Sequence, residues 1–395
     1  MFTPQEVSEK TFPKSPSFSS GYDLAAVDEF LDTLTEDYTA LYKENAALKT
    51  KLKILAEKVE EYRATEDTMR SMLLPVLYLM GTEVPEADVY HSICTGYGGL
   101  LASLGAYVCN KPIILTEHGI YTREREEEII RAGWVQPAFK NQWIRFFYML
   151  SDIIYQRAFR VTSLFGRARQ IQVELGCKPE CCRVIANGVN FTALSKIPLK
   201  QPDGYVDIGA VVRMAPIKDV KTMIYAFFEL SSRVERVRLH ILGGVDDQEY
   251  ADECYALVEQ LGMKNVIFTG RVNIMEYFTK LDFTILTSIS EGQPLSVLES
   301  FAAQRPAVTT DVGCCRALIN GEEGDLLGAA GYCVPMYREG LADAMEKMCS
   351  NRARMLEMGR IGQKRVELYY QQQFMLKNYQ AVYDELREYH GRNRI

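Results

Sequence analysis

The sequence predicts an α/β protein with parallel sheets, preceded by one long helix. Three observations lead to this prediction. Between about residues 87 and 334, short apolar runs alternate with segments of helical pattern, which is typical of parallel sheets. Polar and charged residues follow several of these runs, at the end of the strands where α/β proteins bind ligands. Residues 24–74 contain neither glycine nor proline and repeat apolar residues at helical spacing.

The composition is ordinary for a folded protein and narrows the function classes. Of 395 residues, 47% are hydrophobic and 25% are charged, and the net charge of -7 argues against nucleic-acid binding. No apolar run reaches the roughly 18 residues that a membrane span needs. The ten cysteines form no CxxC pair and the four histidines are well separated. We therefore expect no metal site, and reduced thiols in a cytoplasmic protein.

A heptad repeat runs through the first helix. Apolar residues or tyrosine fill the d position of seven heptads from Val27 onward, and the a positions are polar only at Asn45 and Glu66. An asparagine at an a position fixes the register and favours two strands. We therefore expect a homodimer or a larger oligomer through residues 27–73. The alternative is a single amphipathic helix that packs on its own domain.

The beginning of the chain resembles a known family. Gly21-Tyr22-Asp23, followed by Val27-Asp28-Glu29-Phe30-Leu31, is similar to the N-terminal domain of DivIVA-type proteins, which are cytoplasmic coiled-coil scaffolds. The resemblance covers residues 1–74 and implies a coiled-coil oligomerisation segment. It also implies weak contact with the inner face of a membrane, made by Phe18.

Residues 75–193 are expected to form a partial N-terminal Rossmann-like domain. We expect Pro75 to end the long helix. Short strands are predicted over residues 87–93, 112–116, 160–164 and 182–186. His118 follows the second of these strands, where a histidine can contact substrate. The alternative for His118 is a packed or capping side chain.

The segment after this strand carries a second resemblance. Thr116–Glu128, TEHGIYTREREEE, looks like the signature of PelF-type glycosyltransferases, in retaining family 4 with the GT-B fold. That resemblance implies a UDP-glucose donor, no metal and a role in exopolysaccharide biosynthesis. GT-B enzymes begin with a strand and a glycine-rich loop. Because residues 76–193 hold no such start, we expect a truncated N-terminal domain. Either a partner chain covers the sheet edge and apolar faces that this truncation exposes, or the N-terminal domain is poorly ordered.

Residues 204–365 are expected to form a complete Rossmann-like domain that binds a nucleotide sugar. Arg213 and Lys218 follow the predicted strand 206–212, where two cations suit a diphosphate; surface cations are the alternative. Gly243 and Gly244 follow the next strand and would allow close backbone approach to a ligand.

The stretch Ser288–Glu299 lies between a predicted strand and a predicted helix. Such a turn brings backbone N–H groups to a helix N-terminus, which suits phosphate. Glu291 would lie in the turn and Glu299 within the helix. The alternative is a capped helix with two solvated acids.

The resemblance to retaining GT-B enzymes assigns roles to these residues. Arg213 and Lys218 would hold the diphosphate, Glu291 would face the hydroxyls of the donor sugar, and Glu299 would bind the ribose. His118 would contact the sugar from the N-terminal domain. The backbone of four residues would line the phosphate and sugar, and the loop that begins at Arg271 would lie beside uracil. These four residues are Gln293, Pro294, Leu295 and Ser296.

Three interpretations remain open. The chain is a retaining glycosyltransferase that moves a hexose from a UDP-sugar to a glycan acceptor, or a scaffold with a nucleotide-binding module but little catalysis, or a fusion without a settled function. Two further expectations concern the C-terminal part of the chain. Arg305 stands where this family usually has glycine and would perturb its turn, and helix 366–395 would cross back to the N-terminal domain.

Overall fold

The computed structural model describes residues 1–14 and 21–392 and divides the chain into two compact units, Met1–Leu77 and Tyr78–Ile395. The membrane-contact prediction for Phe18 lies outside the described residues. The fold class is confirmed: the chain is mixed α/β, with parallel sheets and a long N-terminal helix.

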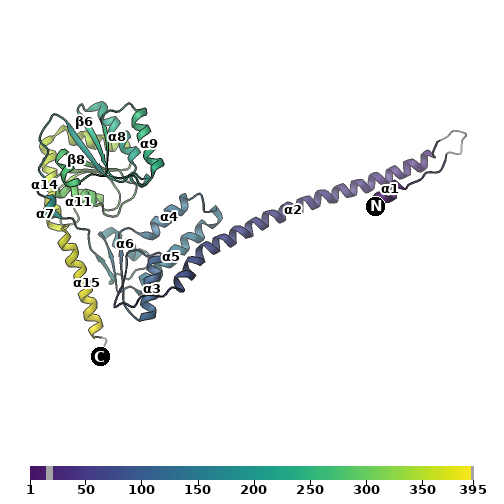
Figure 1. Cartoon of the computed structure of the whole chain (residues 1–395), viewed down its shortest axis with the longest axis horizontal. Helices are drawn as coiled ribbons and strands as arrows, with labels where there is room; N and C mark the ends of the chain where they lie inside the picture. The colour runs from purple at the N-terminus through teal and green to yellow at the C-terminus, as the bar shows by residue number, and fades with distance from the viewer. Residues whose placement is uncertain (15–20, 393–395) are drawn as a thin grey trace. The chain divides into compact units, whose positions relative to one another are not determined.

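The first unit consists of two helices, α1 (Pro4–Ser8) and α2 (Leu24–Met80). Residues before α2 fold back along its first turns (Figure 1). The ring of Phe30 lies 5.1 Å from that of Phe2 and 5.3 Å from that of Phe12, between ring centroids. This aromatic cluster buries Phe30, whereas most apolar side chains farther along α2 are exposed, with Met72 a buried exception.

The prediction that Pro75 ends the long helix is wrong, because α2 continues through Pro75 to Met80. Proline removes one backbone hydrogen bond and crowds the preceding turn, but it does not prevent the residues after it from forming their own bonds. The helix ends at Met80, and in the turn that follows the Thr82 N–H donates to the Leu79 carbonyl at 3.1 Å.

The second unit begins with a four-stranded parallel sheet in the order β1-β2-β3-β4. Strand β2 is buried along its whole length because helices cover both faces of the sheet. The strands are β1 (Tyr90–Ser92), β2 (Ile113–Glu117), β3 (Arg160–Ser163) and β4 (Cys182–Val184). The helices are α3 (Tyr97–Cys109), α4 (Tyr121–Arg131), η1 (Pro137–Phe139), α5 (Lys140–Arg157), α6 (Gly166–Glu174) and α7 (Phe191–Leu194).

A six-stranded parallel sheet follows, in the order β10-β9-β8-β5-β6-β7. The chain builds outward from β5 to β7 and then returns to β8 on the other side of β5. The strand order therefore reverses between β5 and β8, which is where open α/β sheets bind ligands. The strands are β5 (Val206–Val211), β6 (Val237–Leu242), β7 (Val266–Gly270), β8 (Phe283–Leu286), β9 (Ala307–Thr310) and β10 (Gly331–Val334).

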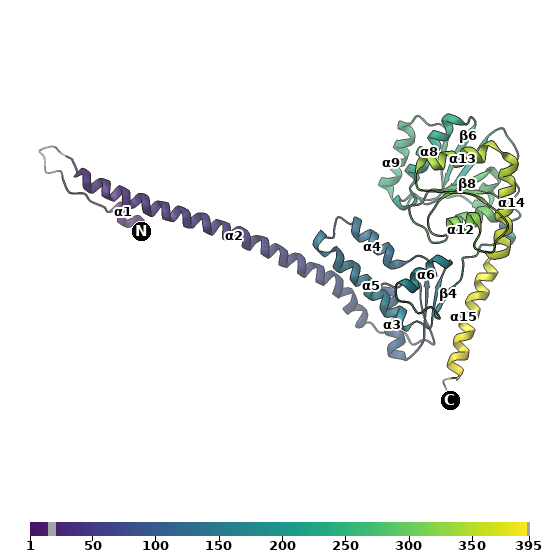
Figure 2. The same cartoon turned by 180° about the vertical axis from the view of Figure 1, so that it is seen from behind.

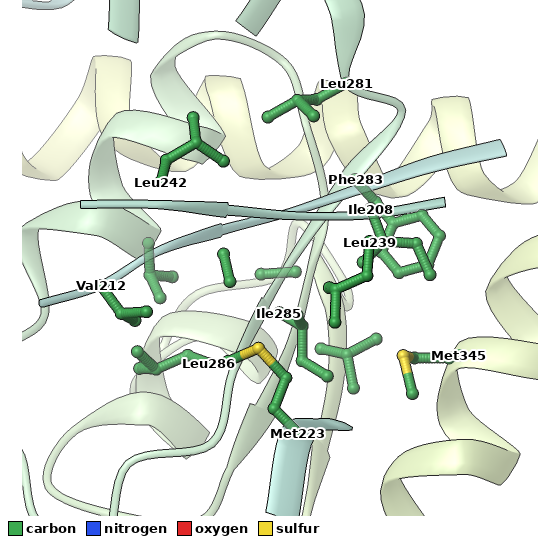
Figure 3. Packing of buried hydrophobic residues seen from close by; sticks show 14 of the residues in the cluster. Ile208, Val212, Met223, Leu239, Leu242, Leu281, Phe283, Ile285, Leu286 and Met345 are labelled. Carbon is green, nitrogen blue, oxygen red and sulfur yellow. The ribbon is translucent and has the colours of Figure 1, made fainter. Parts of the chain in front are cut away.

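Helices pack on this sheet around one large apolar core. Figure 3 shows Ile208 of β5 and Ile285 of β8 near Met223 of α8 and Met345 of α13. The helices are η2 (Pro216–Lys218), α8 (Val220–Arg233), α9 (Gln248–Gln260), α10 (Ile274–Tyr277), η3 (Phe278–Lys280), α11 (Leu295–Ala302), α12 (Cys315–Asn320), α13 (Arg338–Ser350), α14 (Arg352–Tyr369) and α15 (Gln372–Arg392).

The C-terminal helices are separated by two breaks. Asn351 ends α13 and caps α14 by accepting a hydrogen bond from the Arg354 N–H. The helix predicted over residues 366–395 is interrupted at Tyr370, which leaves the helical conformation, and α15 begins at Gln372.

Helix α15 packs on the four-stranded sheet and joins it to the larger domain (Figure 2). Val189 and Gln371 form a parallel bridge where the chain crosses. Beyond it, the hydroxyl of Tyr383 lies 2.7 Å from His91 Nδ1, and Arg160 pairs with Glu385 at 3.1 Å. These contacts bury the face of the small sheet that α15 covers.

Arg305 does not perturb its turn but stabilises it. The preceding Gln304 takes the left-handed conformation, with φ 64°. Arg305 is fully buried, and burial lowers its pKa to about 10. Its guanidinium donates to the carbonyl oxygens of Ile197, Pro198, Phe278, Leu281 and Ala303. The side chain therefore fastens the interdomain linker to the core of the larger domain.

Replacing this arginine tests its structural role. Arg305→Met keeps an apolar chain of similar length but leaves the carbonyls without their donor, so we expect the free energy of unfolding to fall by about 3 kcal/mol. Urea denaturation followed by circular dichroism measures the change. Arg354→Met, which removes an exposed pair with Glu357, is the control and should cost less than about 1 kcal/mol. Equal effects of the two variants would contradict the proposed role.

Candidate functional site

The turn after β8 brings a lysine and an acid together at the switch point. Glu291 Oε1 accepts hydrogen bonds from Lys218 Nζ at 2.5 Å and from Ser288 Oγ at 2.6 Å. The Lys218 and Glu291 side chains are 17% and 12% exposed, so the pair is largely shielded from water. An anion that bound here would compete with Glu291 for the ammonium group of Lys218.

Hydrogen bonds to backbone carbonyl oxygens hold the two loops of this pair together. Thr287 Oγ1 donates to the carbonyls of Lys218 and Asp219, at 3.0 Å each. The N–H of Ile289 donates to the carbonyl of Ile217 at 2.9 Å. Asp219 adopts φ 46° and its side chain caps α8. The loop after β5 and the turn after β8 therefore form one unit.

The start of α11 lies directly after this turn. In the described structure no side chain caps the helix, and such free N–H groups attract anions. Leu295 and Ser296 supply N–H groups there. Pro294, also predicted to line the ligand, has no N–H and offers only its ring and carbonyl. The buried Gln293 uses its side chain differently, since its Oε1 accepts from the Asn187 N–H at 2.6 Å.

A first cavity, of about 310 Å³, lies where the two domains meet. It brings His118, which follows β2, close to Gly292, the neighbour of Glu291. A Cβ atom on Gly292 would lie only 2.1 Å from the His118 carbonyl oxygen, so this approach requires glycine. The lining residues are Ile93, Cys94, His118, Gly119, Tyr121, Glu124 and Gly292.

A second cavity, of about 430 Å³, contains Glu299. Its walls are mainly apolar and include Ile274 and Met275. The segment 271–277 was predicted as a loop beside uracil, but these two residues open the short helix α10. Desolvation raises the pKa of Glu299 above its ordinary value. The other lining residues are Gly188, Val189, Asn190, Ala193, Leu194, Leu295 and Gln372. An acid in an apolar cavity of this size suits a ribose and its base.

The remaining predicted residues form a separate group. Arg213 pairs with Asp246, and its side chain is 64% exposed. A Cβ on Gly243 would meet the Val212 carbonyl oxygen at 1.8 Å, and one on Gly244 would meet Arg271 Nε at 2.7 Å. The structure therefore brings Arg213, Gly243, Gly244 and Arg271 to neighbouring loops. Within the described residues, Arg213 makes no recorded contact with Lys218 or Glu291.

Sequence reasoning missed a buried acid beneath His118. Glu117 is 2% exposed and accepts hydrogen bonds from the Tyr155 hydroxyl at 2.6 Å and from Gln172 Nε2 at 2.9 Å. Burial raises the pKa of Glu117 to about 7, despite these two donors. The signal was present, because this acid directly follows the strand predicted over residues 112–116, but its partners come from distant helices.

Tyr121, Glu124 and Cys94 were also missed as cavity residues. Charges of opposite sign alternate after Thr122, a pattern typical of ion pairs along an exposed helix face, and Arg125 pairs with Glu128 at 2.5 Å. Only the packing of α4 decides that Glu124 lines the cavity instead.

Among the described residues, no three histidine, cysteine or acidic side chains come together as a group that could hold a metal ion. No helix in that part of the chain is long and apolar enough to cross a membrane.

The ionisation of Glu117 makes a testable contribution to stability. Its raised pKa means that the folded protein retains this proton up to about pH 7, whereas the unfolded chain releases it near the ordinary glutamate pKa of 4.5. The free energy of unfolding, relative to Glu117→Gln, should therefore fall by about 2–3 kcal/mol as the pH rises through this window. Urea titrations at several pH values measure it.

The control for this experiment is Glu174→Gln, on α6 in the same domain, whose acid is 52% exposed. Its stability difference from the natural chain should change little with pH. A Glu117→Gln difference that stays constant across the window would contradict the raised pKa.

Comparisons with known proteins agree with this architecture. Residues 206–351 match the family described as glycosyl transferases group 1, and residues 14–180 match a domain of unknown function, DUF3492. The chain is 22% identical over 305 residues to an MMP α-(1→4)-mannosyltransferase of Mycolicibacterium hassiacum, covering 75% of this chain and 70% of that protein.

Two further proteins resemble the chain. It is 24% identical over 314 residues to the capsular polysaccharide glycosyltransferase CapM of Staphylococcus aureus, covering 75% and 77% of the two chains. The crystal structure of Anabaena HepE in complex with UDP and glucose superposes with a TM-score of 0.61 at 15% identity, over 81% of this chain and 80% of that one.

Two parallel-sheet domains that meet at a cleft and share a crossing helix therefore define the GT-B fold. Within this fold, residues 206–351 are similar to the group 1 glycosyl transferases. The resemblances to PelF-type and DivIVA-type proteins remain predictions.

Proposed function

We propose that this chain transfers glucose from UDP-glucose to a glycan acceptor with retention of configuration. The observation that carries the proposal is the Lys218–Glu291 pair, held at the start of α11 between two cavities. Anion-binding groups thus lie between one space suited to a nucleoside and another suited to a sugar.

The nucleoside would occupy the cavity of Glu299, with its ribose hydroxyls donating to the carboxylate. Ile274 and Met275 would contact the base. The diphosphate would then reach the N–H groups of Leu295 and Ser296 and the ammonium of Lys218. In support of a UDP-sugar donor, HepE has a related fold and its crystal structure contains UDP and glucose.

The sugar would enter the cavity that His118 and Gly292 line. Once the diphosphate takes Lys218, Glu291 is free to accept hydrogen bonds from sugar hydroxyls. Arg213 would have to leave Asp246 to reach the phosphates, and its exposed side chain can do so without disturbing the core.

The proposed chemistry uses charge stabilisation rather than a side-chain nucleophile. The bond between the anomeric carbon and the phosphate oxygen breaks, and Lys218 stabilises the negative charge that develops on UDP. The acceptor hydroxyl attacks from the face that UDP leaves, and its proton passes to a phosphate oxygen of UDP. No metal takes part, because lysine and arginine neutralise the diphosphate.

The acceptor would bind in the same cavity as the donor sugar. Tyr121 and Glu124 provide polar groups opposite the donor, which suits a hydroxyl-rich acceptor. We propose a growing polysaccharide, made in exopolysaccharide biosynthesis at the cytoplasmic face of a membrane. The alternative, a nucleotide-binding scaffold, keeps the donor cavity but lacks turnover.

Variants of the ion pair separate binding from turnover. Lys218→Ala should raise the dissociation constant for UDP about 10- to 100-fold, because a charged hydrogen bond is lost. Glu291→Ala should leave UDP binding nearly intact, since Glu291 competes for Lys218, but lower UDP release from UDP-glucose at least about 100-fold. Calorimetry and a UDP-release assay measure these effects.

Lys364→Ala, which removes an exposed cation of α14, is the control and should change neither measurement. Absence of UDP binding by the natural chain would contradict the proposal. Binding of UDP without turnover, with every acceptor glycan tried, would support the scaffold alternative. Turnover that stops on addition of EDTA would contradict the metal-free chemistry.

A second test concerns the ribose. If Glu299 accepts from the ribose hydroxyls, the natural chain should bind UDP about tenfold or more tightly than 2′,3′-dideoxy-UDP. Glu299→Ala should weaken UDP binding and remove this discrimination. Glu357→Ala, an exposed acid on α14, should preserve it. Discrimination that survives in Glu299→Ala would place the ribose elsewhere.

A further inference from the structure

The apolar stripe of α2 is exposed along most of its length. Leu41, Leu48 and Leu55 are 50%, 51% and 57% exposed, and Leu52 on the neighbouring seam position is 65% exposed. The aromatic cluster near Phe30 covers only the beginning of the helix. Since a continuous apolar stripe is costly to leave in water, the stripe requires a partner.

Charges along α2 indicate what that partner is. The helix is acidic before residue 45, with Asp28, Asp37 and Glu44 beside the seam. It is basic from residue 49 to residue 58, where Lys49, Lys51 and Lys58 occupy the equivalent flanking positions. A helix with an acidic half followed by a basic segment is complementary in charge to a second copy of itself in antiparallel orientation.

An antiparallel pairing with full overlap brings opposite charges together. In this pairing, residues at heptad position a of one helix face residues at heptad position d of the other, and the overlap is centred between residues 46 and 47. Leu52, at position a, then faces Leu41 of the second copy, at position d. Glu44 then flanks Lys51 of the second copy, and Asp37 flanks Lys58 of the second copy. By symmetry each of these attractive contacts occurs twice.

A parallel pairing in register is less favourable. Glu66 would face Glu66 of the second copy inside the seam, and Lys58 would flank Arg63 of the second copy. Both contacts place like charges together. Its attractive flanking contact joins Glu44 to Lys49 of the second copy.

Asn45 is compatible with the antiparallel arrangement. It lies near the midpoint of the overlap, so the two Asn45 side chains would be offset by only about 4.5 Å along the helix axis. At that offset two amides can bond with each other, as a polar pair within an apolar seam should.

We propose that α2 binds α2 of a second copy of this chain in antiparallel orientation, with the overlap centred between residues 46 and 47. The two catalytic units then follow opposite ends of the paired helices. The exposed seam residues become buried, and the acidic half of each helix faces the basic segment of the other.

Charge reversal in the full chain distinguishes the orientations, with the dimer dissociation constant measured by sedimentation equilibrium at low ionic strength. Lys51→Glu should raise that constant about tenfold, since it turns two attractive contacts with Glu44 repulsive. Glu44→Lys should have a similar effect. The double variant Glu44→Lys with Lys51→Glu should return the constant close to that of the natural chain.

Lys49→Glu is the matched control, because it makes the same charge change two residues away. It should leave dissociation nearly unchanged. If Lys49→Glu weakens the dimer instead and also rescues Glu44→Lys, the helices are parallel and the proposal is overturned. A natural chain that remains monomeric, or a dimer insensitive to all these changes, also overturns it. Circular dichroism and UDP binding verify that each variant is folded.

Discussion

The contact between Lys218 and Glu291 is the one on which the organisation of the site depends. A lysine and a carboxylate that are this shielded need each other, because removing either leaves a charge in a poor environment. Hydrogen bonds from the Thr287 hydroxyl and the Ile289 N–H to the neighbouring loop hold the two loops at the distance that the ion pair requires. The reversal of strand order between β5 and β8 places both loops at one point. A diphosphate ligand can replace Glu291 as the partner of Lys218 without any change in the backbone of the two loops.

The cleft between the domains is fixed by a second set of contacts. The side chain of Gln293 binds the backbone of Asn187, and Val189 bridges to Gln371 where α15 crosses to the smaller sheet. Arg305 donates a hydrogen bond to a carbonyl oxygen of the linker between the domains and so holds the linker in place. These contacts explain how the domain with the four-stranded sheet positions His118 next to the turn after β8 of the larger sheet.

The long helix has a different character from the two sheet domains that follow it. Most of the apolar residues on its heptad seam are exposed, while the strands of the second unit bury theirs within the chain. In the antiparallel pairing proposed above, the self-complementary charge pattern would determine the orientation of the two helices. Such a pairing would join two copies of the second unit and raise the local concentration of both at one acceptor.

The sequence by itself determined the alternation of strands and helices, and hence the α/β class, because apolar periodicity and chain length report local structure directly. It also placed Lys218, Glu291, Glu299 and His118 at the ends of strands or in the helix that follows. It misjudged Pro75, which a helix can accommodate, and Arg305, whose carbonyl partners come from distant segments. Only the tertiary structure decided that Glu291 pairs with Lys218, that Arg213 pairs with Asp246, and that Glu117 lies buried under Tyr155. Each of these contacts joins residues far apart in the chain, and local pattern carries no information about which distant side chains meet.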